Sequence, residues 1–373
     1  MAAYSDSDSQ QVPARPMPNA PGNLNQHLDE VLVKGRFRTP TSKPPLCHSP
    51  ATVGDMITRP DVFRETHIPR RLPHRQTEMD RLSRALRPAT NDDTPDDVLL
   101  SGPSGVGKTV VARKTLEELQ GSAHIRTANI HCLGSNAGTI LREAIHEHPR
   151  EPTQDIHDTT PVDDVVAALD EIATYPYILL LDEADDVHKT DLSEHLADIE
   201  FVSYIAICHN PEEWLPSLSS DARARVRDHI EFRGYSVDQL ADILDDRARL
   251  GLVEDAVDRP TLERIGRRVD GKARNAIQAL KAASDIAVEN RRDHIEDGDI
   301  PAAISRARAA VRASNIRSLP SQHLLLYGLI QRSGEVLAED LNREYDVVAP
   351  DAFDGEKEVP RSKETRRRYL SKL

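Results

Sequence analysis

The pattern of hydrophobic and polar positions divides the chain into segments of different character. Residues 1–60 are rich in Pro, Ser, Asn and Asp and show little periodicity, which predicts a disordered tail. Ordered sequence is expected from about residue 61, with a short amphipathic helix over Glu78–Leu86.

Short apolar runs then alternate with helical patterns as far as residue 232. Five runs are candidate strands: VLLS (98–101), HIRTANIH (124–131), YILLL (177–181), YIAIC (204–208) and HIEF (229–232). Apolar runs separated by helices are typical of a mostly parallel sheet covered by helices on both faces. The sequence therefore predicts an α/β domain over 61–232.

Beyond Phe232 the pattern is wholly helical. Ser236 and Gln239 form a capping box, and helices are expected at about 260–268, 272–290 and 297–312, giving a small α-domain over 233–313. A third piece, 314–373, contains three further amphipathic patterns. We expect helices there over Ser321–Arg332, Glu335–Tyr345 and Ser362–Lys372.

Composition limits the classes of protein to consider. No apolar stretch approaches the roughly 20 residues of a membrane span, the N-terminus lacks signal-peptide features, and three cysteines make no disulfide framework. These features predict a soluble cytoplasmic protein without membrane contact. Segment 61–300 carries 29 basic and 47 acidic residues, whereas 301–373 carries 13 and 10. The acidic centre argues against nonspecific DNA binding over the whole surface, but permits a basic DNA-binding module at one end.

The stretch GPSGVGKT at 102–109 carries the strongest chemical signal. It fits G-x-x-x-x-G-K-[ST] between a predicted strand and a predicted helix, a context in which backbone N–H groups converge on phosphate oxygens. Lys108 is expected to reach the β- and γ-phosphates and Thr109 to offer its hydroxyl to Mg²⁺. ATP or ADP with Mg²⁺ is the predicted ligand, and the site is assigned to Gly102, Pro103, Ser104, Gly105, Val106, Gly107, Lys108, Thr109 and Val110.

Carboxylates follow the apolar strand in YILLLDEADDV. Asp182 would stand at the strand's C-terminal tip, where open parallel sheets bind ligands, and is expected to hold the metal together with Thr109. Glu183 is expected to polarise the attacking water. The letters DEAD also occur in helicases of that name, but the helical continuation leaves no room for their second α/β domain.

Two polar residues elsewhere would complete a catalytic set. Asn210 follows the YIAIC strand, where its amide could orient the hydrolytic water. Arg274 opens a helix of the α-domain, which could bring its guanidinium to the γ-phosphate if that domain folds over the nucleotide.

Together these elements resemble an AAA+ ATPase, and more narrowly the archaeal replication initiators of the origin-recognition and cell-division-control family. The resemblance covers about 61–373 and includes IPRRLPHR, GPSGVGKT, ILLLDEAD, IEFRGYSVDQLADILDDRA and GKARNAIQALKAASDIA. It implies a P-loop base domain, a helical lid and a C-terminal winged-helix domain. It also implies roles near the nucleotide for Ile68, Pro69, Arg75, Tyr235 and Arg247, with Asn210 as first sensor and Arg274 as second.

The resemblance further implies an arginine finger in DARARVRD that reaches a neighbouring subunit's nucleotide. Arg223 is the first candidate and Arg225 the second. In the C-terminal module the last helix would be the recognition helix. Its predicted DNA contacts are Arg361, Lys363, Arg366 and Arg367. The family's β-hairpin wing should begin where this sequence ends, so we expect a partial winged helix.

Three functions are compatible with these features. The first is an ATP-dependent initiator with slow hydrolysis that binds double-stranded origin DNA, as a monomer or weak oligomer, with the replicative helicase and other initiator subunits as partners. The second is a nucleotide-binding paralogue that acts through protein partners with little DNA contact. The third is a clamp-loader-like AAA+ subunit, against which the helix carrying Arg274 and the winged-helix remnant argue.

Overall fold

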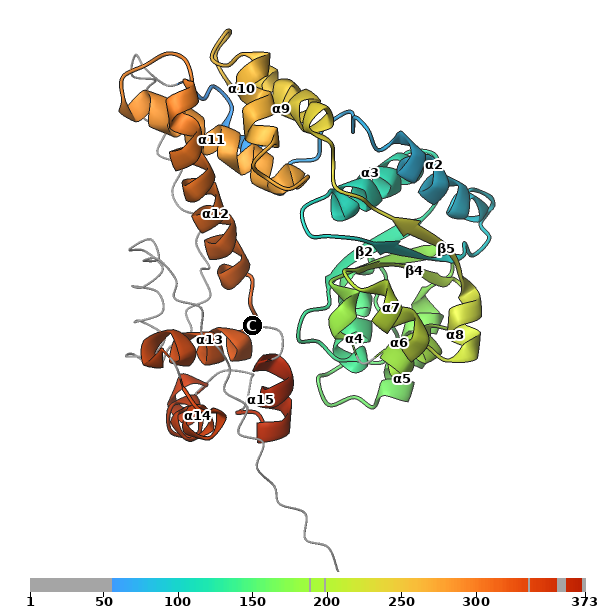
Figure 1. The fold of residues 1–373 in the computed structure, drawn as a ribbon. Coiled ribbons are helices and arrows are strands. Elements are labelled where there is room, and N and C mark those ends of the chain that lie inside the picture. Colours follow the sequence, from blue (N-terminus) through green and yellow to red (C-terminus); the bar gives the residue numbers. More distant parts are fainter. Residues whose placement is uncertain (1–55, 188, 198, 335, 354–359, 371–373) are drawn as a thin grey trace, which may run out of the picture. The chain divides into compact units, whose positions relative to one another are not determined.

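A computed structural model describes residues 56–187, 189–197, 199–334, 336–353 and 360–370. The chain separates into two compact units, and residues 51–307 form the larger one. That unit contains a base built on a β-sheet and a helical lid (Figure 1). The smaller unit contains residues 308–373.

Five parallel strands form the sheet of the base. They are β1 (Asp97–Ser101), β2 (Arg126–His131), β3 (Tyr177–Asp182), β4 (Val202–Cys208) and β5 (Val226–Glu231). Their order is β2-β3-β4-β1-β5, so β1 and β3 both flank β4. Because all strands run the same way, the ends of β1, β3 and β4 lie at one edge, where the predicted site residues follow.

Helices cover both faces of this sheet, as the alternation of apolar runs predicts. One face packs against α2 (Gln76–Ala85) and α3 (Lys108–Gln120), and the other against α4 (Ala137–Glu147) and α5 (Val162–Ile172). Side chains alternate along β1: Val98 and Leu100 face the α2–α3 side, whereas Leu99 faces the α4–α5 side. The remaining base helices are η2 (Arg87–Asn91), η3 (Ala184–Asp186), α6 (Lys189–Ala197), α7 (Pro211–Trp214), η4 (Leu215–Ser217) and α8 (Ser220–Arg225).

The lid contains α9 (Val237–Gly251), α10 (Arg259–Gly266), α11 (Ala273–Glu289), η5 (Asp297–Asp299) and the start of α12 (Ile300–Arg317). The predicted capping box is present at the start of α9, where the side chain of Ser236 accepts from the Gln239 N–H and that of Gln239 accepts from the Ser236 N–H. The core of the lid is rich in alanine, which lets α9 and α11 pack closely.

The segment 56–66, here called the strap, belongs to the lid although it precedes the base in sequence. It contains η1 (Pro60–Phe63), and Met56, Val62 and Phe63 are buried in the lid core. The carbonyl of Gly251 accepts hydrogen bonds from the N–H groups of residues 58 and 59. A Cβ at Gly251 would lie 2.6 Å from the Phe63 ring, so this close contact requires glycine. The sequence pattern predicts residues 61–66 as part of the base, whereas the structure places them with the lid.

The C-terminal unit contains α13 (Ser321–Ser333), α14 (Ala338–Ala352) and α15 (Lys363–Leu370). Its core includes Leu325, Leu329, Tyr345 and Tyr369. The second helix is longer than predicted and continues through Pro350. No β-strand occurs among the described residues of this unit, and the winged-helix assignment stays a prediction.

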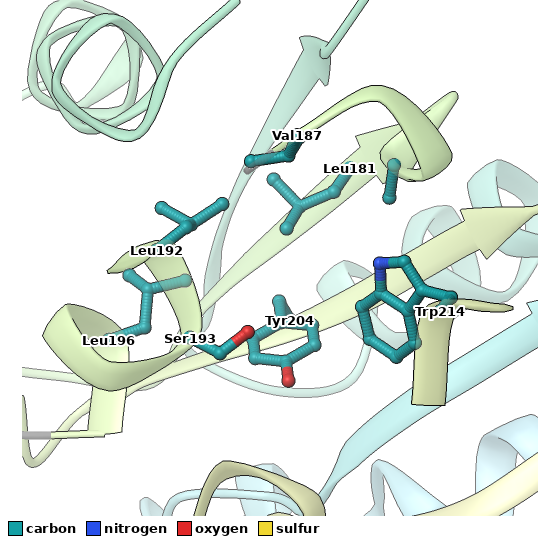
Figure 2. A pocket seen from close by; sticks show the side chains of 8 residues that line it. Leu181, Val187, Leu192, Ser193, Leu196, Tyr204 and Trp214 are labelled. Atoms are coloured by element: carbon teal, nitrogen blue, oxygen red, sulfur yellow. The ribbon is translucent and has the colours of Figure 1, made fainter. Parts of the chain in front are cut away.

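Two further features bear on possible sites. Among the described residues, no helix has the length and apolarity needed to cross a membrane. A small pocket in the base is lined by Leu181, Leu192, Leu196, Tyr204 and Trp214 (Figure 2). Its volume of about 10 Å³ is room for roughly one water molecule, so we interpret it as imperfect packing.

Candidate functional site

The loop 102–109, here called the phosphate loop, connects β1 to α3. Gly102, Gly105 and Gly107 have φ values of 131°, 78° and 96°, in the region that favours glycine. A Cβ at Gly102 would lie 2.2 Å from the carbonyl oxygen of Phe232, so only glycine fits there. This backbone turns tightly at the N-terminus of a 13-residue helix, where anions are stabilised.

Lys108 lies within this loop and is buried. Its Nζ donates to the carbonyl oxygens of Gly102 and Pro103, at 2.5 and 2.9 Å. Burial lowers the pKa of the Lys108 ammonium, and the carboxylates of Asp182 and Asp185 oppose that shift. The ammonium group is therefore held against the backbone of the phosphate loop, where a bound phosphate group would contact it.

A hydroxyl and a carboxylate face each other at the end of β3. The Oγ1 of Thr109 donates to Oδ2 of Asp182 at 3.1 Å, which brings together the two predicted Mg²⁺ ligands. Hydroxyl and carboxylate oxygens suit Mg²⁺, which usually keeps several waters as well. These residues fit the expected metal on chemistry and position.

Glu183 follows Asp182 with φ of 58° and ψ of 42°. A left-handed backbone is uncommon for a non-glycine residue and is often found at functional sites. Its Oε2 lies 3.7 Å from Nε2 of His131, which ends the neighbouring strand β2. Both side chains are more than a third exposed, so the carboxylate has access to water.

Asp185 joins the end of β3 to the end of β4. Its carboxylate accepts from the N–H groups of His209 and Asn210, at 2.7 and 3.0 Å, and contacts the His209 ring at 3.2 Å. Burial opposes ionisation, but the hydrogen bonds from His209 and Asn210 lower the pKa of Asp185 to about 2. This ionised carboxylate fixes the backbone of Asn210, whose side chain is exposed near the strand tips.

Arg75 connects the phosphate loop to the lid. Its guanidinium donates to the carbonyl of Val106 at 3.0 Å, to the carbonyl of residue 233 at 2.7 Å and to the hydroxyl of Tyr235 at 2.8 Å. It also lies 4.0 Å from the centre of the Tyr235 ring and pairs with Glu78 at 2.6 Å. Tyr235 in turn approaches the loop, because a Cβ at Gly107 would lie 3.2 Å from its hydroxyl.

The N-terminus of α11 lies directly against the phosphate loop. The N–H of Arg274 donates to the carbonyl of Gly105 at 3.2 Å, and a Cβ at Gly105 would lie 3.1 Å from Cβ of Arg274. The guanidinium pairs with Glu65 of the strap at 2.7 Å. The N-terminus of α11 therefore lies beside the phosphate loop, and the role of Arg274 as second sensor stays a prediction.

Three other residues assigned to the nucleotide have different surroundings. Ile68 and Pro69 lie in the segment between strap and α2, and Ile68 is one of the exposed large apolar side chains. Arg247 is buried in the lid and donates to the carbonyl of Val62 at 2.8 Å. Its observed contact stabilises the strap, and its role at the nucleotide stays a prediction.

The two finger candidates differ sharply. Arg225 is held inside the base, where it pairs with buried Asp97 at 2.9 Å and donates to the carbonyls of residues 196 and 202. This arrangement is incompatible with a finger that leaves its own subunit. Arg223 is exposed and donates to the carbonyls of residues 216 and 218 on its own loop, so it is the candidate that remains.

The basic residues of the C-terminal unit also separate into two groups. Arg361, Lys363 and Arg367 are exposed, as a DNA-contacting surface requires. Arg366 is not: it is 3% exposed, stacks on the Tyr345 ring at 4.4 Å and pairs with Asp346 at 2.9 Å. The prediction that Arg366 contacts DNA is therefore wrong in this structure, because its guanidinium joins α15 to α14.

Two residues beside the site, Asp185 and Glu65, and one at the opposite end of β1, Asp97, were not predicted from the sequence. Asp185, Glu65 and Asp97 each act through a partner that is distant along the chain. The third acidic residue in DEAD was a weak signal for Asp185. We find no comparable local signal for Glu65 or Asp97.

Two family models match the chain. One, described as an AAA ATPase domain, matches residues 71–208, and the other, a Cdc6 AAA+ ATPase-type lid domain, matches residues 241–305. These matches cover most of the base, as far as the end of β4, and most of the part of the lid that follows it in sequence.

Similar proteins carry a consistent description. The chain is 30% identical over 323 residues to the ORC1-type DNA replication protein 9 of Halobacterium salinarum, covering 85% of this chain and 88% of the relative. It is also 30% identical over 298 residues to that organism's ORC1-type DNA replication protein 1, covering 78% and 95%.

Solved structures agree. The Cdc6p structure from Pyrobaculum aerophilum has a TM-score of 0.60 and 25% identity, and covers 85% of this chain and 90% of its own. The Aeropyrum pernix ORC1 protein, solved in complex with DNA, shares the fold with a TM-score of 0.64 at 22% identity, covering 86% and 87%. From its phosphate loop, its Cdc6-type lid and these relatives, the chain belongs to the archaeal Cdc6/Orc1 family of AAA+ replication proteins.

Proposed function

We propose that this protein is an ATP-dependent initiator of DNA replication that binds origin DNA and helps to recruit or load the replicative helicase. One observation carries the proposal: the N–H of Arg274 bonds to the carbonyl of Gly105, so the lid meets the phosphate loop directly. A nucleotide in the loop would therefore contact base and lid together. The ORC1-type relatives supply the replication context.

Residues of the phosphate loop and of its surroundings are assigned separate roles at the nucleotide. Lys108 and the loop N–H groups would hold the phosphates, and Arg274 would bind the γ-phosphate. Thr109 and Asp182 would hold Mg²⁺, which neutralises phosphate charge when bound. Glu183 would accept the proton of the attacking water, while Asn210 orients that water. Arg223 would reach the nucleotide of a neighbouring subunit.

Slow hydrolysis fits a switch better than a motor. In this proposal bound ATP keeps base and lid together, and turnover resets the protein. DNA binding is assigned to the exposed basic residues Arg361, Lys363 and Arg367 of the C-terminal unit.

The test is Lys108→Ala, assayed for ATP binding and for affinity to origin DNA with and without ATP. We expect ATP binding to fall by at least about a hundredfold, since a charge-assisted contact to phosphate is lost, and the ATP-dependent part of DNA affinity to disappear. Unchanged ATP binding and unchanged DNA affinity would refute the proposal. Replacement of Lys114, on the same helix but paired with Glu117, is the matched control.

A second candidate function is a nucleotide-binding paralogue that acts through protein partners. The acid balance of segment 61–300 and the burial of Arg366 favour it, because both reduce the charge available to DNA. A salt titration separates the two functions. With three phosphate contacts, log affinity should fall against log salt with a slope of about −3. A flat response would favour the paralogue.

A further inference from the structure

The guanidinium of Arg274 is already occupied by a carboxylate of the same chain. Nε of Arg274 lies 2.7 Å from Oε1 of Glu65, and the arginine side chain is 24% exposed. Because Arg274 stands against the phosphate loop, a phosphate group and Glu65 would compete for the same cation.

Glu65 is held in place by the packing of the strap. Phe63, two residues earlier, is 1% exposed in the lid core, and its carbonyl accepts from Nε2 of Gln278 on α11 at 2.9 Å. Arg247 binds the carbonyl of the preceding residue, Val62. Glu65 therefore follows an anchored segment beside the helix that carries Arg274, so a rigid-body movement of the lid would not by itself separate the pair.

We propose that Glu65 is a positioning residue that lowers the preference of the site for ATP over ADP, because it holds the guanidinium of Arg274 until a γ-phosphate competes for it. This inference rests on the proposed function, in which Arg274 binds that phosphate. ADP has no group to draw the guanidinium away, so the Glu65 pair persists with ADP. With ATP the γ-phosphate would compete with Glu65 for the guanidinium, and the free energy lost from the pair would be subtracted from ATP binding alone.

The expected effect is modest, because the pair is partly exposed. Exposed and half-exposed ion pairs contribute free energies that correspond to about two- to fivefold in an equilibrium constant. Glu65→Gln should therefore tighten ATP binding by about two- to fivefold and leave ADP binding unchanged. Glutamine keeps the shape and a hydrogen-bond acceptor, so the strap should stay packed.

The experiment is a double-mutant cycle on the full chain, measured as the dissociation constants of ATP and ADP for the wild type, Glu65→Gln, Arg274→Ala and the double variant. In the Arg274→Ala background, Glu65→Gln should have no effect on ATP. A general effect of removing negative charge near a triphosphate would instead persist there, and would act on ADP as well. Asp61→Asn, which removes a strap carboxylate paired locally with Arg59, is the matched control.

The measured dissociation constants distinguish failure of the Glu65 inference from failure of the role proposed for Arg274. If Arg274→Ala weakens ATP binding but Glu65→Gln does not tighten it, the inference about Glu65 is overturned and the proposed function stands. If Arg274→Ala leaves ATP binding unchanged, Arg274 does not bind the γ-phosphate, and the inference about Glu65 is refuted as well. Tighter ATP binding in Glu65→Gln that vanishes without Arg274 supports both.

Discussion

Replacing Arg225 by alanine should destabilise the base rather than impair contact between subunits. Asp97, at the first position of β1, is 1% exposed, and its carboxylate accepts from Nε of Arg225 and from the N–H of Tyr204. Removing the arginine leaves a buried carboxylate without its cation and removes a donor from two backbone carbonyls. Breaking a buried pair costs about 3–5 kcal/mol. Because the Arg225 side chain is 26% exposed, water can replace part of it, and we expect a loss of about 2–4 kcal/mol.

The pH dependence of this effect follows from Asp97. Burial raises its pKa from 3.8 to about 6, although Arg225 opposes the shift. A carboxyl whose folded pKa is raised contributes stability that is complete below about pH 4 and is lost as pH rises through 6. The difference between a pKa of 3.8 and one of about 6 corresponds to about 3 kcal/mol in the free energy of unfolding. Without Arg225 the pKa should rise further, so the deficit of Arg225→Ala should be largest near pH 8 and small near pH 5.

Urea unfolding followed by tryptophan fluorescence measures this directly. Trp214 is the only tryptophan of the chain, and it is buried in the same core cluster of the base as Tyr204 and Ala222. Arg223→Ala, two residues earlier on α8 and exposed, is the control and should change the free energy of unfolding by less than about 0.5 kcal/mol. Equal unfolding midpoints for Arg225→Ala and Arg223→Ala at pH 8 would refute this reasoning.

Other predictions concern the loop, the water-activating carboxylate and the C-terminal unit. Glu183→Gln should retain ATP affinity and lose turnover by about a hundredfold or more, measured as phosphate release; loss of ATP binding instead would show a structural role. Gly102→Ala should abolish nucleotide binding, because its Cβ meets the Phe232 carbonyl, whereas Gly298→Ala, with no atom within 4 Å of its Cβ, should bind normally in the same titration. Arg366→Ala should lower the melting temperature of the C-terminal unit, because the contacts of Arg366 with α14 are lost. We expect a loss of about 1–3 kcal/mol in the free energy of unfolding. Arg367→Ala should leave that temperature unchanged and reduce the salt slope of DNA binding by about one; the reverse pattern would contradict the assignment.

Local patterns predicted most of the base and the phosphate loop. The glycines of GPSGVGKT specify a turn through their backbone freedom, and an apolar strand that ends in Asp182 specifies its own edge of the sheet. Such signals lie within a few residues of one another, so they can be found in a single sequence.

What the sequence did not predict depends on contacts between distant residues. The Arg225–Asp97 pair joins positions 128 apart, and the Arg274–Glu65 pair joins positions 209 apart. The strap has too short an apolar pattern to indicate that Phe63 enters the lid. Arg366 lies in a run of like charges, which is typically solvated, and its burial depends on contacts with the Tyr345 ring, the Asp346 carboxylate and the Asn342 carbonyl on α14.

The strap also constrains how base and lid can move. Because the lid is assembled from segments on either side of the base in sequence, the chain crosses between them twice, near residues 66–75 and again near 232–236. A body on a single linker can tumble in any direction, whereas one held by two short linkers swings mainly about the line that joins them. Arg75 bonds to the second crossing from the end of the first, through the carbonyl of residue 233. Nucleotide-driven motion of the lid relative to the base should therefore be mainly a rotation about one axis, which can be measured as a single angle.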